Sequence, residues 1–154
     1  GIGLLKGERY KPSLLDNIAF GAYNDKIENP YSKSAWLTKD NAIVEKYDND
    51  KFCTFKFTVN GYKTLFESIG FIQKKSNIEK IPKDLPVFII AGAEDPVGEY
   101  GKGVKIVYET YKAAGIKDIT MKLYDGDRHE ILNELDREDV YKDVSEGIVR
   151  HIPG

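Results

Sequence analysis

The chain has 154 residues, a length that fits one domain with a substantial buried core. Its 41% hydrophobic and 31% charged residues are ordinary for a globular protein, and its net charge of −2 gives no electrostatic basis for binding nucleic acid or an anionic membrane surface. No apolar run approaches the roughly 18 residues that a transmembrane helix needs, and the first residues lack the basic-then-apolar pattern of a signal peptide, so we expect neither. The single cysteine, Cys53, allows no intrachain disulfide, so the cytoplasm is the compartment we expect.

The N-terminal half lacks a strand pattern and predicts short helices joined by aromatic loops. Ser13, Thr38 and Thr58 are candidate N-caps, and Gly21 is placed to end the first helix. The apolar positions behind these caps are Leu14, Leu15 and Ile18, then Ile43, Val44 and Tyr47, then Val59, Tyr62, Leu65, Phe66 and Ile69. Such pieces, in residues 1–75, could form a helical cap or lid but would not easily make a free-standing core.

The C-terminal half, residues 76–154, alternates strand and helix. An apolar run at 87–91, bounded by Pro86 and Gly92, predicts a buried strand, and alternation over 119–124 predicts a second strand nearer a sheet edge. Between them lies a helical stretch with Gly115 as its stop, and Asp136 is a candidate cap for a closing helix. The helical apolar positions are Val104, Val107, Tyr108 and Tyr111, then Val140, Val144 and Ile148. This order predicts an α/β fold with two parallel strands joined by a right-handed crossover.

An acid and an imidazole follow the two predicted strands. Asp95 comes shortly after the first strand, and His129 follows the second through Asp125-Gly126-Asp127, which is a turn signature. Because the carboxyl ends of parallel strands meet at one edge of a sheet, we expect the two side chains to converge. A histidine that acts as a general base on a hydroxyl needs a carboxylate to fix its tautomer. Asp95 and His129 are therefore the candidate catalytic residues.

The segments 85–98 and 126–134 carry a resemblance to a known family. Glu94-Asp95-Pro96-Val97 and Arg128-His129-Glu130 resemble the C-terminal third of bacterial α/β-hydrolases, in particular the lysophospholipase or monoacylglycerol-lipase-like group, also called the serine aminopeptidase S33 type. In that family the Asp is the acid and the His the base of a Ser-Asp-His triad. The resemblance implies that the N-terminal half is the cap inserted over the site and that the chain is the last two parallel strands with their helices.

The nucleophile that the family uses is missing. Gly-x-Ser-x-Gly occurs nowhere, and no serine follows a strand with flanking glycines. The chain starts at Gly1, and its one methionine is Met121. We therefore expect a trimmed chain, one that lacks an N-terminal portion, or a deliberately chosen piece of a longer protein, with the nucleophile serine and the oxyanion hole on the missing half. This piece alone is expected to be inactive.

Other chemistries compete with the triad. Cys53 is expected to be buried and inert, because it lies between aromatic residues and not on a strand-to-helix turn. The acids around His129 match no calcium or zinc signature, and Asp125 and Asp127 are expected to serve the turn, so no metal or cofactor is predicted. Gly101-x-Gly103 is expected to shape a helix start.

Four aromatic residues are the candidate substrate-binding residues: Trp36, Phe52, Phe55 and Phe57. They are expected either to line an apolar pocket beneath the cap or to form the cap's own small core.

The expected activity is serine-dependent hydrolysis of a carboxylic ester of a lipid-like or small acyl substrate, with peptide, thioester and acyl-transfer chemistry left open. The alternative is an inactive fragment that acts as a binding module through its cap pocket and its open sheet edge, which also makes a homo-oligomer an expectation.

Overall fold

The computed structural model describes residues 7–152. The elements in chain order are helices α2 (Ser13–Phe20), α3 (Asn41–Asn49), α4 (Val59–Ile72) and α5 (Lys75–Ile78), strand β1 (Val87–Gly92), helix α6 (Lys102–Ala113), strand β2 (Ile119–Tyr124), the 3₁₀ turn η1 (Ile131–Asn133) and helix α7 (Arg137–Val149). This order confirms the mixed α/β class that the sequence predicts.

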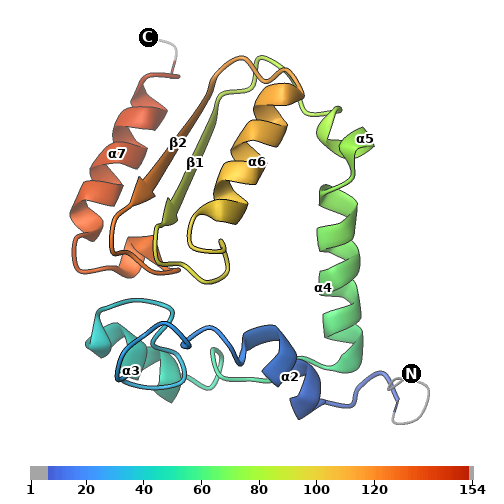
Figure 1. The fold of residues 1–154 in the computed structure, drawn as a ribbon, viewed down its shortest axis with the longest axis vertical. Helices are drawn as coiled ribbons and strands as arrows, with labels where there is room; N and C mark the ends of the chain where they lie inside the picture. Colours follow the sequence, from blue (N-terminus) through green and yellow to red (C-terminus); the bar gives the residue numbers. More distant parts are fainter. Residues whose placement is uncertain (1–6, 153–154) are drawn as a thin grey trace.

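The two strands pair in parallel, as predicted, with Val87 opposite Ile119 and Gly92 opposite Tyr124. Helices α6 and α7 lie on opposite faces of this pair (Figure 1). A side chain at Gly101, just before α6, would collide with Leu123, whereas one at Gly147 in α7 would meet Phe88. Leu123 and Phe88 point to opposite faces in this register, because side chains alternate along a strand.

The main buried cluster lies between the sheet and α7. Tyr124, Ile131 and Val140 form it, and Ile90 and Val144 pack against them. The Tyr124 hydroxyl donates to Asp143 on α7, and burial together with that bond raises the pKa of Tyr124. The every-fourth-residue pattern of α7 thus meets the Tyr124 face of β2 in this core, whereas the apolar residues that alternate along β2 (Ile119, Met121 and Leu123) lie on the opposite face, toward α6.

The N-terminal half begins beyond the carboxyl ends of the strands, where α2 and α3 lie at the bottom of Figure 1, and its helix α4 rises on the far side of α6 from the strands, toward α5. Its own packing centres on Tyr62, which is buried and donates a hydrogen bond to Asp16 in α2. Burial and this bond raise the pKa of Tyr62 to about 12. Backbone bonds from Val59 to Tyr10 and from Asn60 to Glu8 join the start of α4 to the segment before α2.

The predicted caps were right in part. Thr58 caps α4 by accepting from the Gly61 amide, and Gly21 is the C-cap residue of α2. Thr38 and Ser13 were wrong as caps. Asp40 caps α3, since its carboxylate accepts from Ala42 and Ile43, and Ser13 lies one residue inside α2.

In the C-terminal half, the helices begin and end at the positions that the sequence predicts. Gly115 follows α6 with φ of 92°, and Gly101 starts that helix with φ of 81°, which confirms the helix-start interpretation of Gly101-x-Gly103. Asp136 occupies the N-cap position of α7, but its side chain makes no capping hydrogen bond.

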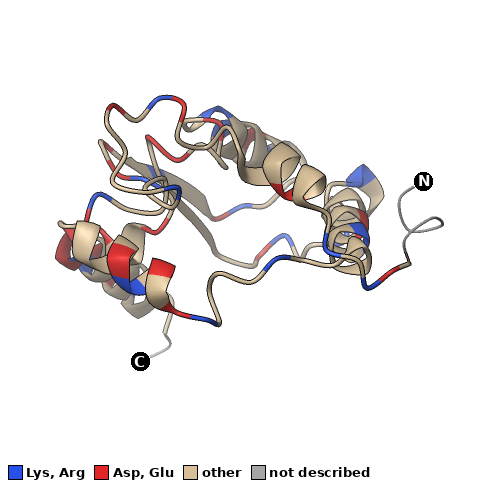
Figure 2. Cartoon of the chain, turned by 90° about the horizontal axis from the view of Figure 1, so that it is seen from below, with Lys and Arg blue, Asp and Glu red and all other residues tan. Residues whose placement is uncertain are grey.

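Charge is spread over the molecule. In Figure 2 the acidic and basic positions are interspersed, and neither sign is confined to one element. Between residues 7 and 152, no helix has the length and apolar character needed to cross a bilayer.

Candidate functional site

The loop after β1 fixes Asp95 by both of its carboxylate oxygens. Oδ1 accepts the Val97 amide at 2.8 Å, an Asx-type turn, and Oδ2 lies 3.0 Å from Nδ1 of His129. The Tyr100 amide closes the loop on the Asp95 carbonyl at 2.9 Å. Asp95 is only 6% exposed, and these bonds orient its carboxylate toward the histidine.

His129 stands after β2 with its two ring nitrogens in different environments. Nδ1 pairs with Asp95, whereas Nε2 makes no hydrogen bond within residues 7–152, and the side chain is 37% exposed. The hydrogen bond to Asp95 raises the pKa of His129 against the opposing effect of burial, and the charges of Asp95 and Glu130 raise it further. If Nδ1 carries the proton, Nε2 has a free lone pair, which is the state of a general base.

Aromatic rings from the N-terminal half cover the imidazole. Trp36 lies with its ring centroid 5.0 Å from that of His129, and Tyr23 packs edge-on against Trp36 at 4.8 Å. Burial and the nearby Asp95 carboxylate raise the pKa of Tyr23. Trp36 was a predicted site residue, whereas no sequence pattern pointed to Tyr23.

A short segment of the N-terminal half, which we call the strap (residues 35–39), is bonded to the loop that carries His129, which we call the histidine loop (residues 125–134). The amides of His129 and Glu130 donate to the carbonyls of Trp36 and Leu37, at 3.3 and 2.7 Å. The Thr38 hydroxyl donates to the Asn133 carbonyl at 3.0 Å. The strap therefore holds the indole over the imidazole.

Buried charges reinforce the same contact, and the sequence did not reveal them. Asp127 is fully buried and pairs with the Lys39 ammonium at 2.9 Å, so it does more than serve the turn. Burial raises the pKa of Asp127, although Lys39 opposes that shift. Glu134 is also fully buried, and Arg128 donates from Nη1 to the carbonyls of Ala35 and Thr38. These partners lie about ninety residues apart in the chain, so no local spacing could have paired them.

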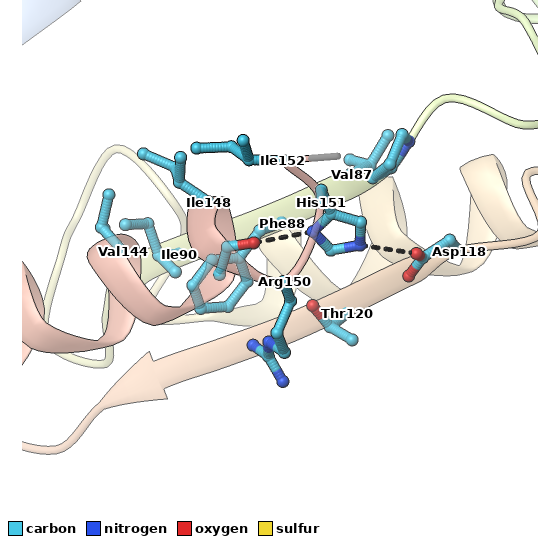
Figure 3. A pocket seen from close by; sticks show the side chains of 12 residues that line it. Val87, Phe88, Ile90, Asp118, Thr120, Val144, Ile148, Arg150, His151 and Ile152 are labelled. Carbon is cyan, nitrogen blue, oxygen red and sulfur yellow. Dashed lines mark hydrogen bonds and ion pairs between the residues drawn. The ribbon is translucent and has the colours of Figure 1, made fainter. Parts of the chain in front are cut away.

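An apolar cavity lies elsewhere, between β1, β2 and α7 (Figure 3). It measures about 660 Å³ and is lined largely by apolar side chains, among them Phe88, Ile90, Val144 and Ile148. His151 at its rim bonds Gly147 O through Nδ1 and Asp118 through Nε2, at 2.7 and 2.8 Å (Figure 3). Because both of its nitrogens are engaged, His151 has no free lone pair for proton abstraction, in contrast to His129.

The three phenylalanines that were predicted to bind substrate make no ring contact with His129. Phe55 packs on Phe57, and Phe57 on the buried Tyr62, so these two extend the small core of the N-terminal half. Phe52 is 75% exposed with Lys51 above its ring. Of the four candidates, Trp36 alone contacts His129.

Within residues 7–152, neither Cys53 nor a serine is hydrogen-bonded to His129. Cys53 is half-buried, so the expectation of a buried thiol was too strong, and partial burial with Asp50 beside it raises the pKa of its thiol. Among residues 7–152, no serine donates a hydrogen bond to His129, and no cluster of three or more His, Cys, Asp or Glu has the arrangement of a metal site.

Parallel strands followed by an acid and a histidine, with a helix on each face, are part of an α/β-hydrolase fold. The family described as "Serine aminopeptidase, S33" matches residues 8–136, and the chain belongs to this family. No curated protein matches the chain.

Solved structures agree with the family. A thermostable carboxyl esterase from Bacillus coagulans superposes with a TM-score of 0.81 at 29% identity, covering 96% of this chain and 47% of the esterase. A structure described as an open-form lipase gives 0.80 at 28% identity, covering 90% of this chain and 45% of the lipase. A monoacylglycerol lipase from Paleococcus ferrophilus shares the fold at 19% identity, with a TM-score of 0.64 over 94% of this chain and 56% of the lipase. The chain thus spans about half the length of the structures it resembles.

Proposed function

We propose that this chain supplies the acid, the base and the lid of a serine hydrolase whose nucleophile lies on polypeptide outside these 154 residues. The observation that carries the proposal is the Asp95–His129 pair, with Nδ1 3.0 Å from Asp95 and Nε2 without a hydrogen bond in the part of the chain that the structure describes. Family membership and the similarity to a carboxyl esterase and a lipase support the class of reaction.

In the proposed mechanism, Nε2 of His129 takes the proton from the attacking serine hydroxyl. Asp95 keeps the remaining proton on Nδ1 and stabilises the imidazolium that forms. His129 then returns the proton to the leaving alcohol, and later takes one from the water that releases the acyl group. The oxyanion hole would come from the same polypeptide as the serine.

A carboxylic ester of a lipid-like or small acyl group is the proposed substrate. The N-terminal half lies beyond the carboxyl ends of the strands, where a lid would cover the site (Figure 1). Trp36 would present an apolar surface beside Nε2, and Phe52, Phe55 and Phe57 remain proposed contacts for the acyl chain farther out on the lid.

The serine-bearing partner would dock on the open side of the sheet. Within residues 7–152, β1 pairs with β2 along one edge and with no strand along the other. The apolar cavity beside Phe88 and Ile90 adjoins this strand, and Ile148 on α7 is 56% exposed. An unpaired strand edge next to an apolar groove favours addition of another strand and helix.

The same surface favours a second candidate function, an inactive fragment that binds another chain or a second copy of itself. Intact mass and light scattering separate the two. A co-purifying polypeptide, or a longer precursor, together with ester hydrolysis that His129→Ala abolishes supports the hydrolase. A dimer of the 17.4 kDa chain without hydrolysis supports the binding module. Hydrolysis of a p-nitrophenyl ester by the 17.4 kDa chain alone would contradict the need for an outside serine.

A further inference from the structure

Glu134 is a buried carboxylate that bridges two segments far apart in the sequence. Its Oε2 accepts the amide of Lys39 on the strap at 3.0 Å, and its Oε1 accepts the amide of Arg128 on the histidine loop at 2.8 Å. The residue is fully buried. A carboxylate is costly to bury unless its oxygens are hydrogen-bonded, and here each oxygen binds a backbone N–H from a different segment.

Both amides adjoin the residues that form the candidate site. Arg128 immediately precedes His129, and Lys39 ends the strap whose Trp36 carbonyl accepts the His129 amide. The Lys39–Asp127 pair and the Arg128 bonds to Ala35 and Thr38 cross the same gap. Glu134 is the one fully buried carboxylate in the described residues whose two oxygens join the strap to the histidine loop.

We propose that Glu134 is a positioning residue that clamps the strap to the histidine loop, so that Trp36 stays on the imidazole and Nδ1 of His129 stays on Asp95. The proposal rests on the proposed function for its catalytic meaning. Under this proposal the strap and the histidine loop move as one unit, because the Glu134 carboxylate is bonded to both.

Glu134→Gln isolates this role. The glutamine side chain has nearly the same volume, but its amide group offers one acceptor oxygen and one NH₂ donor. One of the two backbone N–H groups would then face a donor in a buried place, which breaks one arm of the clamp. The charges that raise the pKa of His129 are those of Asp95 and Glu130, and Glu134 is not among them. A change at His129 in this variant therefore reports geometry.

The control is Glu130→Gln, the same chemical change on the same loop. The charge of Glu130 raises the pKa of His129, and its carboxylate accepts a hydrogen bond from the Asn133 side chain. That carboxylate makes no hydrogen bond to the strap in the described residues. The variant should lower the pKa of His129 while leaving Trp36 in contact with the ring.

Two readouts follow the site without measuring catalysis, so their failure is distinct from failure of the proposed hydrolase. The chain has two histidines, so the ring protons of His129 can be titrated by NMR and assigned with His151→Gln. It has one tryptophan, Trp36, whose emission a protonated imidazole in contact would quench.

In Glu134→Gln we expect a folded chain in which the pKa of His129 falls and Trp36 emission loses its pH-dependent step. In Glu130→Gln we expect the step to persist at lower pH. A folded Glu134→Gln chain with both readouts unchanged, or loss of the step in both variants, would overturn the proposal. If circular dichroism shows that Glu134→Gln is unfolded, Thr38→Val takes its place, because it removes the bond from the strap to the Asn133 carbonyl. Thr38→Val must then lose the pH-dependent step of Trp36 emission. A folded Thr38→Val chain with both readouts unchanged would also overturn the proposal.

Discussion

Gly92→Ala should displace the histidine loop from the end of β1. Gly92 is buried, and a Cβ there would lie much closer than 3.0 Å to the carbonyl oxygens of Asp127 and Arg128, whereas ordinary contact begins at 3.4 Å. Both obstacles are backbone atoms, so no side-chain rotation relieves the clash. Either the strand end or the histidine loop has to move, and the Glu94 amide, which donates to Asp127 O at 2.8 Å, would lose its partner.

The size of the effect follows from this overlap. Forcing a methyl group into a close-packed place costs about 1–3 kcal/mol of unfolding free energy. The carbonyls have to retreat by on the order of 1 Å, a displacement that costs about 100-fold in rate when it misplaces a catalytic group. Urea denaturation measures the first quantity, and the NMR titration of His129 reports whether its bond to Asp95 survives.

Gly70→Ala is the matched control, because a Cβ at Gly70 in α4 meets nothing within 4 Å. Alanine is the better helix former by about 1 kcal/mol, so this variant should be neutral or slightly more stable. The reasoning about the histidine loop would be refuted by a Gly92→Ala chain with wild-type unfolding free energy and a wild-type His129 titration.

Four further predictions concern the acid, the base and the core. In the hydrolase assembled with its serine-bearing partner, Asp95→Asn and His129→Ala should each lower kcat by about 10⁴-fold with the fold retained, and near-normal rates would mean that the roles are misassigned. The pH profile of kcat/KM should rise as pH increases through the raised pKa of His129, because the base must be neutral; a profile that falls there would contradict the role. The same pair should stabilise the fold fully below the ordinary histidine pKa and lose that contribution as pH rises through the raised one, so His129→Ala should cost more stability in acid than in alkali. Val140→Ala, at a fully buried position, should lower the unfolding free energy by about 2–3 kcal/mol in urea, whereas Val149→Ala, 65% exposed on the same helix, should stay within about 0.5 kcal/mol.

The sequence predicted the strands and their helices well because their patterns are local. Each element shows its buried positions in its own sequence pattern: an apolar run in β1, alternation in β2, and an apolar residue at every fourth position around Val140 in α7. The order strand–helix–strand then leaves few possible topologies. The convergence of Asp95 and His129 followed from that topology and not from either residue alone.

The parts that were missed depend on contacts between distant segments. Glu134 and Asp127 look like ordinary surface acids in the sequence, and only the approach of the strap buries them. The N-cap of α3 was misplaced because Thr38 and Asp40 are both good caps two residues apart; the Thr38 hydroxyl instead binds the Asn133 carbonyl. Propensity cannot decide such a competition when a tertiary contact claims one of the candidates.

Labelling with a fluorophosphonate probe tests the central claim most directly, since the probe forms a covalent bond only with an activated serine. The account predicts no labelling of the purified 154-residue chain, and labelling of a serine on the partner polypeptide once the two are combined, dependent on His129. Labelling of any serine within residues 1–154, or partner labelling that survives His129→Ala, would contradict it.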